Sequence, residues 1–258
     1  MQFRVSPLTI SVLKKAVIIS AIMVMFAVVM GGSLNPFSWK TQCERFISPQ
    51  QLIQPEKTAA FYAEMEDSVK DNPVQIFSVI ERKIRYTGDV FNYKALNHLA
   101  TAEEVLQSGR DDCDGQAVLL CSVLQYAGYT SFTVIGPNHA WVEVETEEPL
   151  LINYKGGDWI VKFNDSSIQW NYTAFLFMML GNFFLMTVFF SIVLYMYKKG
   201  FQTYVTESFG YFKYIFLLLI LVAAAAVIMA RWWVSGLLTS SIALLFIMEV
   251  ISRIRKKW

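Results

Sequence analysis

The sequence predicts an α+β domain, in which helices are followed by an antiparallel sheet, together with four transmembrane α-helices. Four apolar runs, nearly free of charged residues, are each about as long as a helix that crosses a bilayer. A long polar segment separates the first run from the second. In this segment apolar residues recur with a helical period up to Gly128 and alternate after it, which is typical of an α+β domain.

The apolar runs divide the chain into three parts. One such run is typical of a buried core helix, but four of them favour membrane spans. The runs are residues 16–32, 174–197, 214–230 and 232–251. We therefore expect an N-terminal part with the first span (1–33), an extracytoplasmic domain (34–172) and three further spans (173–258). A cleaved signal peptide is the alternative for the first run, although the run is long for one and no A-x-A site follows.

Lysines and arginines at the ends of the runs orient this arrangement. They gather before the first run, between the second and third, and after the fourth. These places share one side of a four-span chain, so we expect a multi-pass protein of the cell membrane with both termini cytoplasmic. Residues 34–172 carry 11 lysines and arginines against 19 aspartates and glutamates. Such an acidic segment is not expected to bind nucleic acid.

Helix-capping signals punctuate the first half of the polar segment. The predicted helices are residues 72–86, 101–109 and 113–128. The first begins with Asn72 and Pro73, a frequent N-cap and first-turn pair. The second begins with a capping box of Thr101 and Glu104, and the last two end at glycines. The proline-rich stretch 35–57 is aperiodic and predicts a linker packed over the domain.

Alternation of apolar and polar residues predicts strands in the second half of the segment. The strands are residues 129–136, 139–145, 149–155 and 158–165, and the turn-forming sequences "PN", "TEE" and "GG" separate them. Their order along the chain, with short connections, predicts antiparallel pairing.

Cys113 stands at the start of the third predicted helix, with aspartates at positions 111, 112 and 114. The helix dipole favours the thiolate there, whereas the aspartates oppose it by like-charge repulsion. Activation would come mainly from a histidine, and His139 begins a predicted strand at the sheet edge that a helix N-terminus can meet. The cysteines lack the short spacing of zinc ligands, so we expect neither a metal site nor a cofactor.

The other two cysteines leave two interpretations open. On the oxidising side of a membrane, Cys43 and Cys121 can form a disulfide that leaves Cys113 free. Alternatively, Cys121 is a reduced core residue. We favour the second interpretation, because free cysteine is commonly buried and Cys121 lies on an apolar stripe of its predicted helix.

Three motifs follow one another in an informative order. They are "YTGD" at 86–89, "AEEVLQSGRDDCDGQAVLLCSVLQYAGY" at 102–129 and "HAWVEVE" at 139–145, and a strand with a tryptophan and a closing acid comes next. Together they resemble the transglutaminase-like core of the papain-type cysteine hydrolase superfamily, over roughly residues 72–167. The resemblance implies a Cys–His–Asp triad with Cys113 as nucleophile and His139 as general base and acid.

The third triad residue departs from the family pattern. Family members commonly have an aspartate four positions after the tryptophan, whereas Asp165 follows Trp159 by six positions. Alternation still places both on one face of a strand, so Asp165 is the expected third residue. Asn153 is the alternative, because an asparagine can also orient a catalytic histidine.

The resemblance implies acyl transfer through a thioester on Cys113. We expect a membrane-anchored cysteine protease or amidase acting on a peptide or protein. A protein-glutamine transglutaminase with the same triad, or an inactive peptide-binding module of a membrane assembly, is the alternative. The expected partners are the substrate, the lipid bilayer and a membrane protein bound through the transmembrane helices.

Overall fold

The computed structural model describes residues 7–200. By its contacts the chain divides into two compact units, Val24–Leu180 and Met1–Met23 with Gly181–Trp258. The first unit contains the polar segment.

The helices are α1 (Pro7–Val29), α2 (Pro36–Ile47), α3 (Ala59–Ala63), α4 (Asp67–Lys70), α5 (Pro73–Lys83), α6 (Asp89–Asn92), α7 (Ala102–Ser108), α8 (Cys113–Tyr126) and α9 (Tyr172–Lys199), with 3-10 turns η1 (Pro49–Leu52) and η2 (Pro55–Thr58). The strands are β1 (Arg85–Tyr86), β2 (Arg110–Asp111), β3 (Ser131–Ile135), β4 (Ala140–Val144), β5 (Leu150–Ile152), β6 (Val161–Phe163) and β7 (Ile168–Trp170).

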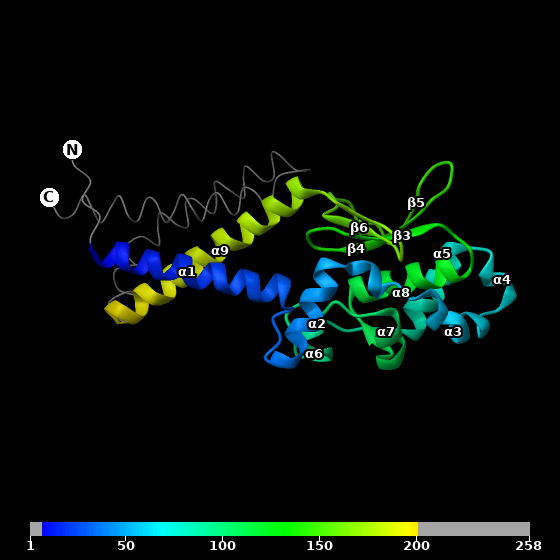
Figure 1. Cartoon of the computed structure of the whole chain (residues 1–258), viewed down its shortest axis with the longest axis horizontal. Coiled ribbons are helices and arrows are strands. Elements are labelled where there is room, and N and C mark those ends of the chain that lie inside the picture. The colour runs from blue at the N-terminus through cyan, green and yellow to red at the C-terminus, as the bar shows by residue number, and fades with distance from the viewer. Residues whose placement is uncertain (1–6, 201–258) are drawn as a thin grey trace, which may run out of the picture. The chain divides into compact units, whose positions relative to one another are not determined.

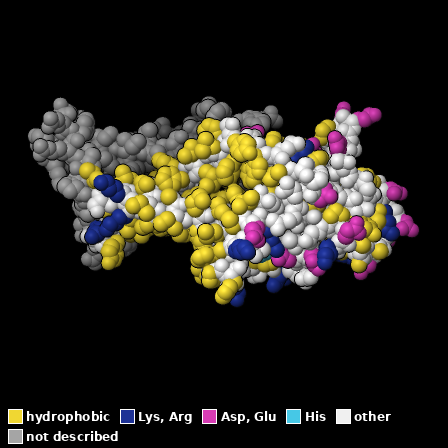
Figure 2. Space-filling model, viewed as in Figure 1, with side chains coloured by type: hydrophobic (Ala, Val, Ile, Leu, Met, Phe, Trp, Pro, Cys, Tyr) yellow, Lys and Arg dark blue, Asp and Glu magenta, His cyan; other side chains and the backbone are white. Residues whose placement is uncertain are grey.

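Two helices carry the first two predicted apolar runs. Ile10–Val29 in α1 and Tyr172–Lys198 in α9 are each long and apolar enough to cross a membrane, and hydrophobic side chains gather over this part of the chain on the face that Figure 2 shows. A signal sequence near an N-terminus passes the same test, so the structure supports either role for α1. The predicted third and fourth spans, residues 214–230 and 232–251, lie outside the described residues.

Helix α8 is the centre of the domain. It packs against β3 and β4 on one side and against α5 and α7 on another (Figure 1). Every residue from Gly115 to Leu124 is buried, which explains why this helix is apolar almost all round. Cys121 is among these buried residues, and all three cysteines are free thiols, as expected for the reduced core interpretation.

The predicted sheet is present and has one more strand than expected. Its order is β5-β4-β3-β6-β7, with every neighbouring pair antiparallel. The additional strand β7 follows a turn in which the Asn164 side chain accepts hydrogen bonds from the backbone N–H groups of Ser166 and Ser167. This turn ends β6 at Phe163, two residues before the predicted strand end. The α+β prediction is confirmed.

The caps predicted from sequence position the helices of the domain. The Asn72 side chain accepts hydrogen bonds from the first turn of α5, and Thr101 and Glu104 form the complete capping box of α7. Helix α7 ends at Gly109, which has the left-handed conformation that favours glycine. These local signals fix where α5 and α7 begin, and thereby which of their faces reach α8.

The linker predicted at 35–57 is wrong, because most of this stretch is helical. Helix α2 begins at Pro36 after Asn35, whose side chain accepts a hydrogen bond from the N–H of Phe37. The two residues that α2 buries, Gln42 and Arg45, are polar. A periodicity search for apolar residues therefore misses this helix, because its inward face is polar.

Candidate active site

The Cys113 thiol lies in the first turn of α8 and is half-buried. Asp112 caps the helix by accepting a hydrogen bond from the N–H of Asp114. Burial raises the pKa of the Cys113 thiol, and the Asp112 charge adds to this effect. Hydrogen bonds from the backbone N–H groups of Ala140 and Cys113, and the charge of Lys155, act in the opposite direction. The thiol therefore needs a base to become a strong nucleophile.

His139 directly precedes Ala140, the residue whose N–H reaches the thiol. Cys113, the first residue of α8, and His139, which directly precedes β4, thus lie at the N-terminal ends of two elements that pack on each other. His139 Nε2 lies 2.7 Å from the carbonyl oxygen of Asn153. A carbonyl can only accept, so this contact places a proton on Nε2, and in the neutral form of the ring Nδ1 is then the nitrogen without a proton. An unprotonated Nδ1 is what a general base requires.

Asn153 holds the histidine through its backbone. Its φ is +63°, in the left-handed region that few residues other than glycine and asparagine adopt. This conformation ends β5 one residue after Ile152 and lets the carbonyl of Asn153 contact the ring. Asn153 was the alternative orienting residue, and the structure brings it to His139 by its main chain rather than by its side-chain amide.

Asp165 is not brought to the pair. In the antiparallel pairing of β6 with β3, Val161 lies opposite Ile135, whose partner on β4 is Ala140. His139 is therefore near the Val161 end of β6, whereas Asp165 follows the other end, exposed in the β6–β7 turn. Among the hydrogen bonds of the described residues, the His139 ring donates to the Asn153 carbonyl, and none joins the ring to Asp165.

Buried acids surround the start of α8. Asp89 of α6, Asp111 and Asp112 bring carboxylate oxygens within 4.8 Å of one another, close enough to hold a metal ion. Asp111 accepts hydrogen bonds from Tyr93 Oη at 2.7 Å and from the Asp112 N–H at 2.8 Å. Asp89 accepts one from the N–H of His98, and its Oδ1 atom is buried without a hydrogen bond.

Burial raises the pKa of both Asp89 and Asp111 to about 7. For Asp89 the charge of Asp112 adds to the shift, and burial also raises the pKa of Asp114. These acids hold protons that aspartates in water would release. Sequence reasoning noted the acids beside Cys113 but gave Asp89 no role, because it is far from them along the chain.

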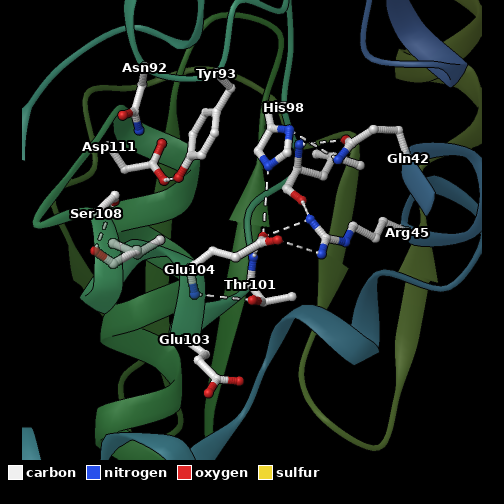
Figure 3. Close-up of polar contacts among 12 residues, drawn as sticks. Gln42, Arg45, Asn92, Tyr93, His98, Thr101, Glu103, Glu104, Ser108 and Asp111 are labelled. Carbon is white, nitrogen blue, oxygen red and sulfur yellow. Dashed lines mark hydrogen bonds and ion pairs between the residues drawn. The ribbon is translucent and has the colours of Figure 1, made fainter. Parts of the chain in front are cut away.

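A second polar cluster joins α2 to the N-terminus of α7 (Figure 3). Arg45 donates two hydrogen bonds to the Glu104 carboxylate, at 2.7 and 2.9 Å, and one to the carbonyl of Leu99. His98 Nε2 is 3.7 Å from Glu104, an electrostatic contact, and its ring stacks on Tyr93 at 3.8 Å. Burial raises the pKa of Glu104, but His98 and Arg45 outweigh it, so the pKa is lowered overall. His98 therefore has structural partners in this cluster, and its backbone N–H connects the cluster to Asp89.

We expect the domain to lose stability as the pH rises from 5 to 8. Asp89 and Asp111 keep protons up to about pH 7 when folded and release them near pH 4 when unfolded. Their contribution is full below about pH 4 and is lost as the pH rises through 7, on the order of 1 kcal/mol per pH unit for each group. Denaturant unfolding of the full chain in detergent at the two pH values measures this.

Asp89→Asn is the matched variant for this experiment, because its amide keeps the size of the carboxyl group and cannot ionise. It should flatten the pH dependence and unfold at a higher denaturant concentration than the parent chain at pH 8. Equal stability of the parent chain at pH 5 and pH 8 would contradict the raised pKa values.

Comparison with known proteins adds no assignment. No family model, no curated protein and no solved structure matches the chain. The functional proposal therefore depends on the chain's own residues and their geometry.

Proposed function

We propose that the domain is a membrane-anchored thiol acyl-transfer enzyme, and that its main activity is that of a cysteine protease or amidase. The observation that carries this proposal is the placement of His139, whose Nε2–H donates a hydrogen bond to the Asn153 carbonyl and which directly precedes Ala140, the residue whose N–H contacts the Cys113 thiol. A nucleophile, a base and a group that orients the base are the three parts such an enzyme needs.

The proposed reaction begins with proton transfer from Cys113 Sγ to His139 Nδ1. The sulfur attacks the carbonyl carbon of a peptide or amide, and N–H groups at the start of α8 stabilise the negative oxygen. The C–N bond breaks, His139 returns the proton to the leaving amine, and the acyl group remains on Cys113 as a thioester. Water then hydrolyses the thioester, with His139 again as base.

The raised thiol pKa favours this order of events. Because burial and the Asp112 charge raise the pKa of the Cys113 thiol, Cys113 rests as a neutral thiol. The proton then moves during the attack, as in general base catalysis, rather than beforehand. Asn153 fixes the ring for this transfer through a backbone carbonyl, a role that the triad implied by the resemblance gives to an aspartate.

Iodoacetamide labelling of the full chain in detergent tests the reactive pair. At pH 7 we expect Cys113 to be alkylated faster in the parent chain than in a His139→Ala variant, because the variant lacks the base. Cys43, a half-buried thiol on α2, is an internal control whose rate should be unchanged. Mass spectrometry gives both rates from one sample, and equal Cys113 rates in the two chains would contradict the proposal.

Transglutaminase activity is the second candidate, because an amine can attack the same thioester in place of water. Incorporation of a fluorescent primary amine into a glutamine-containing protein distinguishes this outcome from hydrolysis. A chain that carries out neither reaction and binds peptides would instead be the inactive module of a membrane assembly. The intact Cys113 and His139 favour an enzyme over the module.

The proposed location is the cell membrane, with residues 34–172 outside and both termini in the cytoplasm. The lysines and arginines at the ends of the apolar runs support this orientation. Protease added to intact cells should therefore digest the domain, provided that it cleaves the same domain in opened cells. Protection in intact cells together with digestion in opened cells would reverse the orientation. The predicted spans, among them residues 214–230 and 232–251, would be available to bind a membrane-protein partner.

A further inference from the structure

Helix α2 buries two polar residues and exposes two large apolar ones beside charged ones. It buries the polar residues Gln42 and Arg45 against the domain. Its outward face carries Phe37 and Ile47, whose exposed fractions are 90% and 65%. A helix that borders water exposes polar residues and buries apolar ones. Lys40, Thr41 and Glu44 are exposed beside these two apolar residues, so the outward face of α2 is partly apolar and partly charged, a composition that fits the boundary of a membrane.

The inward polar contacts fix which face of α2 points outward. The Gln42 side chain accepts a hydrogen bond from the N–H of Leu99 and lies 3.1 Å from His98 Nδ1. Arg45 binds Glu104 and the Leu99 carbonyl, as described above. Rotating the helix to bury Phe37 would break these bonds. It would separate Arg45 from Glu104 and leave the partly buried Glu104 charge without its partner, which costs free energy.

The outward face continues into the turn that precedes α2. Leu34 is 89% exposed, and Leu96, 56% exposed, lies against Gly32. Gly31 and Gly32 both have positive φ, and the Gly31 carbonyl accepts hydrogen bonds from the 96–97 loop. A side chain at either glycine would collide with this loop, so the glycines allow the close approach. We call Leu34, Phe37, Ile47 and Leu96 together the α2 face.

Helix α2 also runs between the two places where the apolar helices join the domain. At its start, Trp39 packs on Phe26 of α1 at 5.6 Å between ring centroids. At its end, Phe46 contacts Trp170 and Phe175, where α9 begins. Figure 1 shows α2 next to the end of α1. Trp and Tyr concentrate at the ends of membrane spans, because their rings suit the boundary between headgroups and acyl chains.

We propose that the α2 face lies in the headgroup region of a phospholipid bilayer and holds the domain against the membrane. The proposal rests on the membrane anchoring stated under the proposed function. Phe37, Ile47 and Leu34 enter the boundary of the acyl chains, as in helices that lie in the membrane plane. Lys40 is exposed between Phe37 and Ile47, 3.8 Å from Glu44, and in the bilayer its ammonium group reaches the phosphates.

A bilayer fits this surface better than a protein partner for two reasons. The α2 face belongs to the same compact unit as the last residues of α1 and the first residues of α9, the helices that are apolar enough to span a membrane. Trp39 and Trp170 lie near the two ends of α2, and tryptophan is common where a protein crosses the boundary of a membrane. The indole N–H of Trp39 donates a hydrogen bond to the Ser33 carbonyl at 2.6 Å.

The experiment places a fluorescent probe on the face in the full chain. Cys43→Ser and Cys113→Ser leave buried Cys121 as the remaining native thiol, and Phe37→Cys then takes a polarity-sensitive dye. Val74→Cys is the matched control, because Val74 is an exposed apolar residue on α5, away from α2. Both chains are reconstituted in nanodiscs of phosphatidylcholine and phosphatidylglycerol, with and without nitroxide-labelled headgroups.

We expect the dye at position 37 to shift its emission to the blue and to lose intensity when the nitroxide headgroups are present. The dye at position 74 should show neither change. Equal responses at the two positions would overturn the proposal, and so would a blue shift at position 37 without nitroxide quenching, which indicates protein rather than lipid cover. If the chain does not enter nanodiscs at all, the membrane anchoring has failed, which is a different result.

Discussion

His139→Ala should lower the rate of acyl transfer by about 10²- to 10⁴-fold, the range that general base catalysis contributes. The release of nitrophenol from p-nitrophenyl acetate by the full chain in detergent measures this rate. Cys113→Ala should abolish the release and the acetyl-enzyme that mass spectrometry detects on Cys113. Loss of the ester reaction in Cys113→Ala with an unchanged rate in His139→Ala would show that the thiol reacts without the proposed base.

Two further variants identify the group that orients His139. Asn153→Gly keeps the carbonyl and favours the same left-handed backbone, so it should retain most of the activity. Asp165→Ala should leave the rate unchanged, because Asp165 lies at the other end of β6. A loss in Asn153→Gly comparable to that in His139→Ala would instead assign the role to the side-chain amide, and a large loss in Asp165→Ala would restore the triad implied by the resemblance.

Arg45→Met should destabilise the domain by about 2–4 kcal/mol, because it leaves the partly buried Glu104 carboxylate without its main partner. The variant removes three hydrogen bonds that connect α2 to α7 and to the loop before it. Denaturant unfolding of the full chain at pH 7 measures the change. At this pH Glu104 is ionised when folded, since its pKa is lowered.

Lys57→Met is the matched control, because Lys57 pairs with the neighbouring Glu103 on the surface at 3.2 Å. An exposed pair of this kind contributes at most about 1 kcal/mol. The double variant Arg45→Met with Glu104→Gln should recover part of the lost stability, because no unpaired charge remains. Equal effects of Arg45→Met and Lys57→Met would show that the Arg45 pair is not a buried interaction.

Local sequence signals predicted three helices of the domain, α5, α7 and α8, and four strands of its sheet, β3 to β6. Asn72, Thr101 and Glu104 mark helix starts because a capping side chain contacts backbone only two or three residues away. The strands β3 to β6 follow from alternation, with ends shifted by turn residues such as Asn164. The failure at α2 has the same physical basis, since a helix with a polar inner face shows no apolar period.

The candidate site was predictable in part. Cys113 and His139 were identified from residue type, position in their elements and the order of the motifs. The orienting group could not be identified in this way, because any residue has a backbone carbonyl and only the register of β4 with β5 brings that of Asn153 to the ring. Asp165 could match the family aspartate only if the strand continued to residue 165, but β6 ends at Phe163.

By itself the sequence determined the α+β class, the apolar helices, the capped helix starts and the candidate pair of thiol and imidazole. These depend on composition and on contacts between near neighbours in the chain. The tertiary structure alone decided that Asp89 lies beside Asp111, that Asn153 holds His139, and that α2 exposes Phe37 and Ile47. Such contacts depend on the packing of distant segments around α8, and no local pattern of residues encodes them.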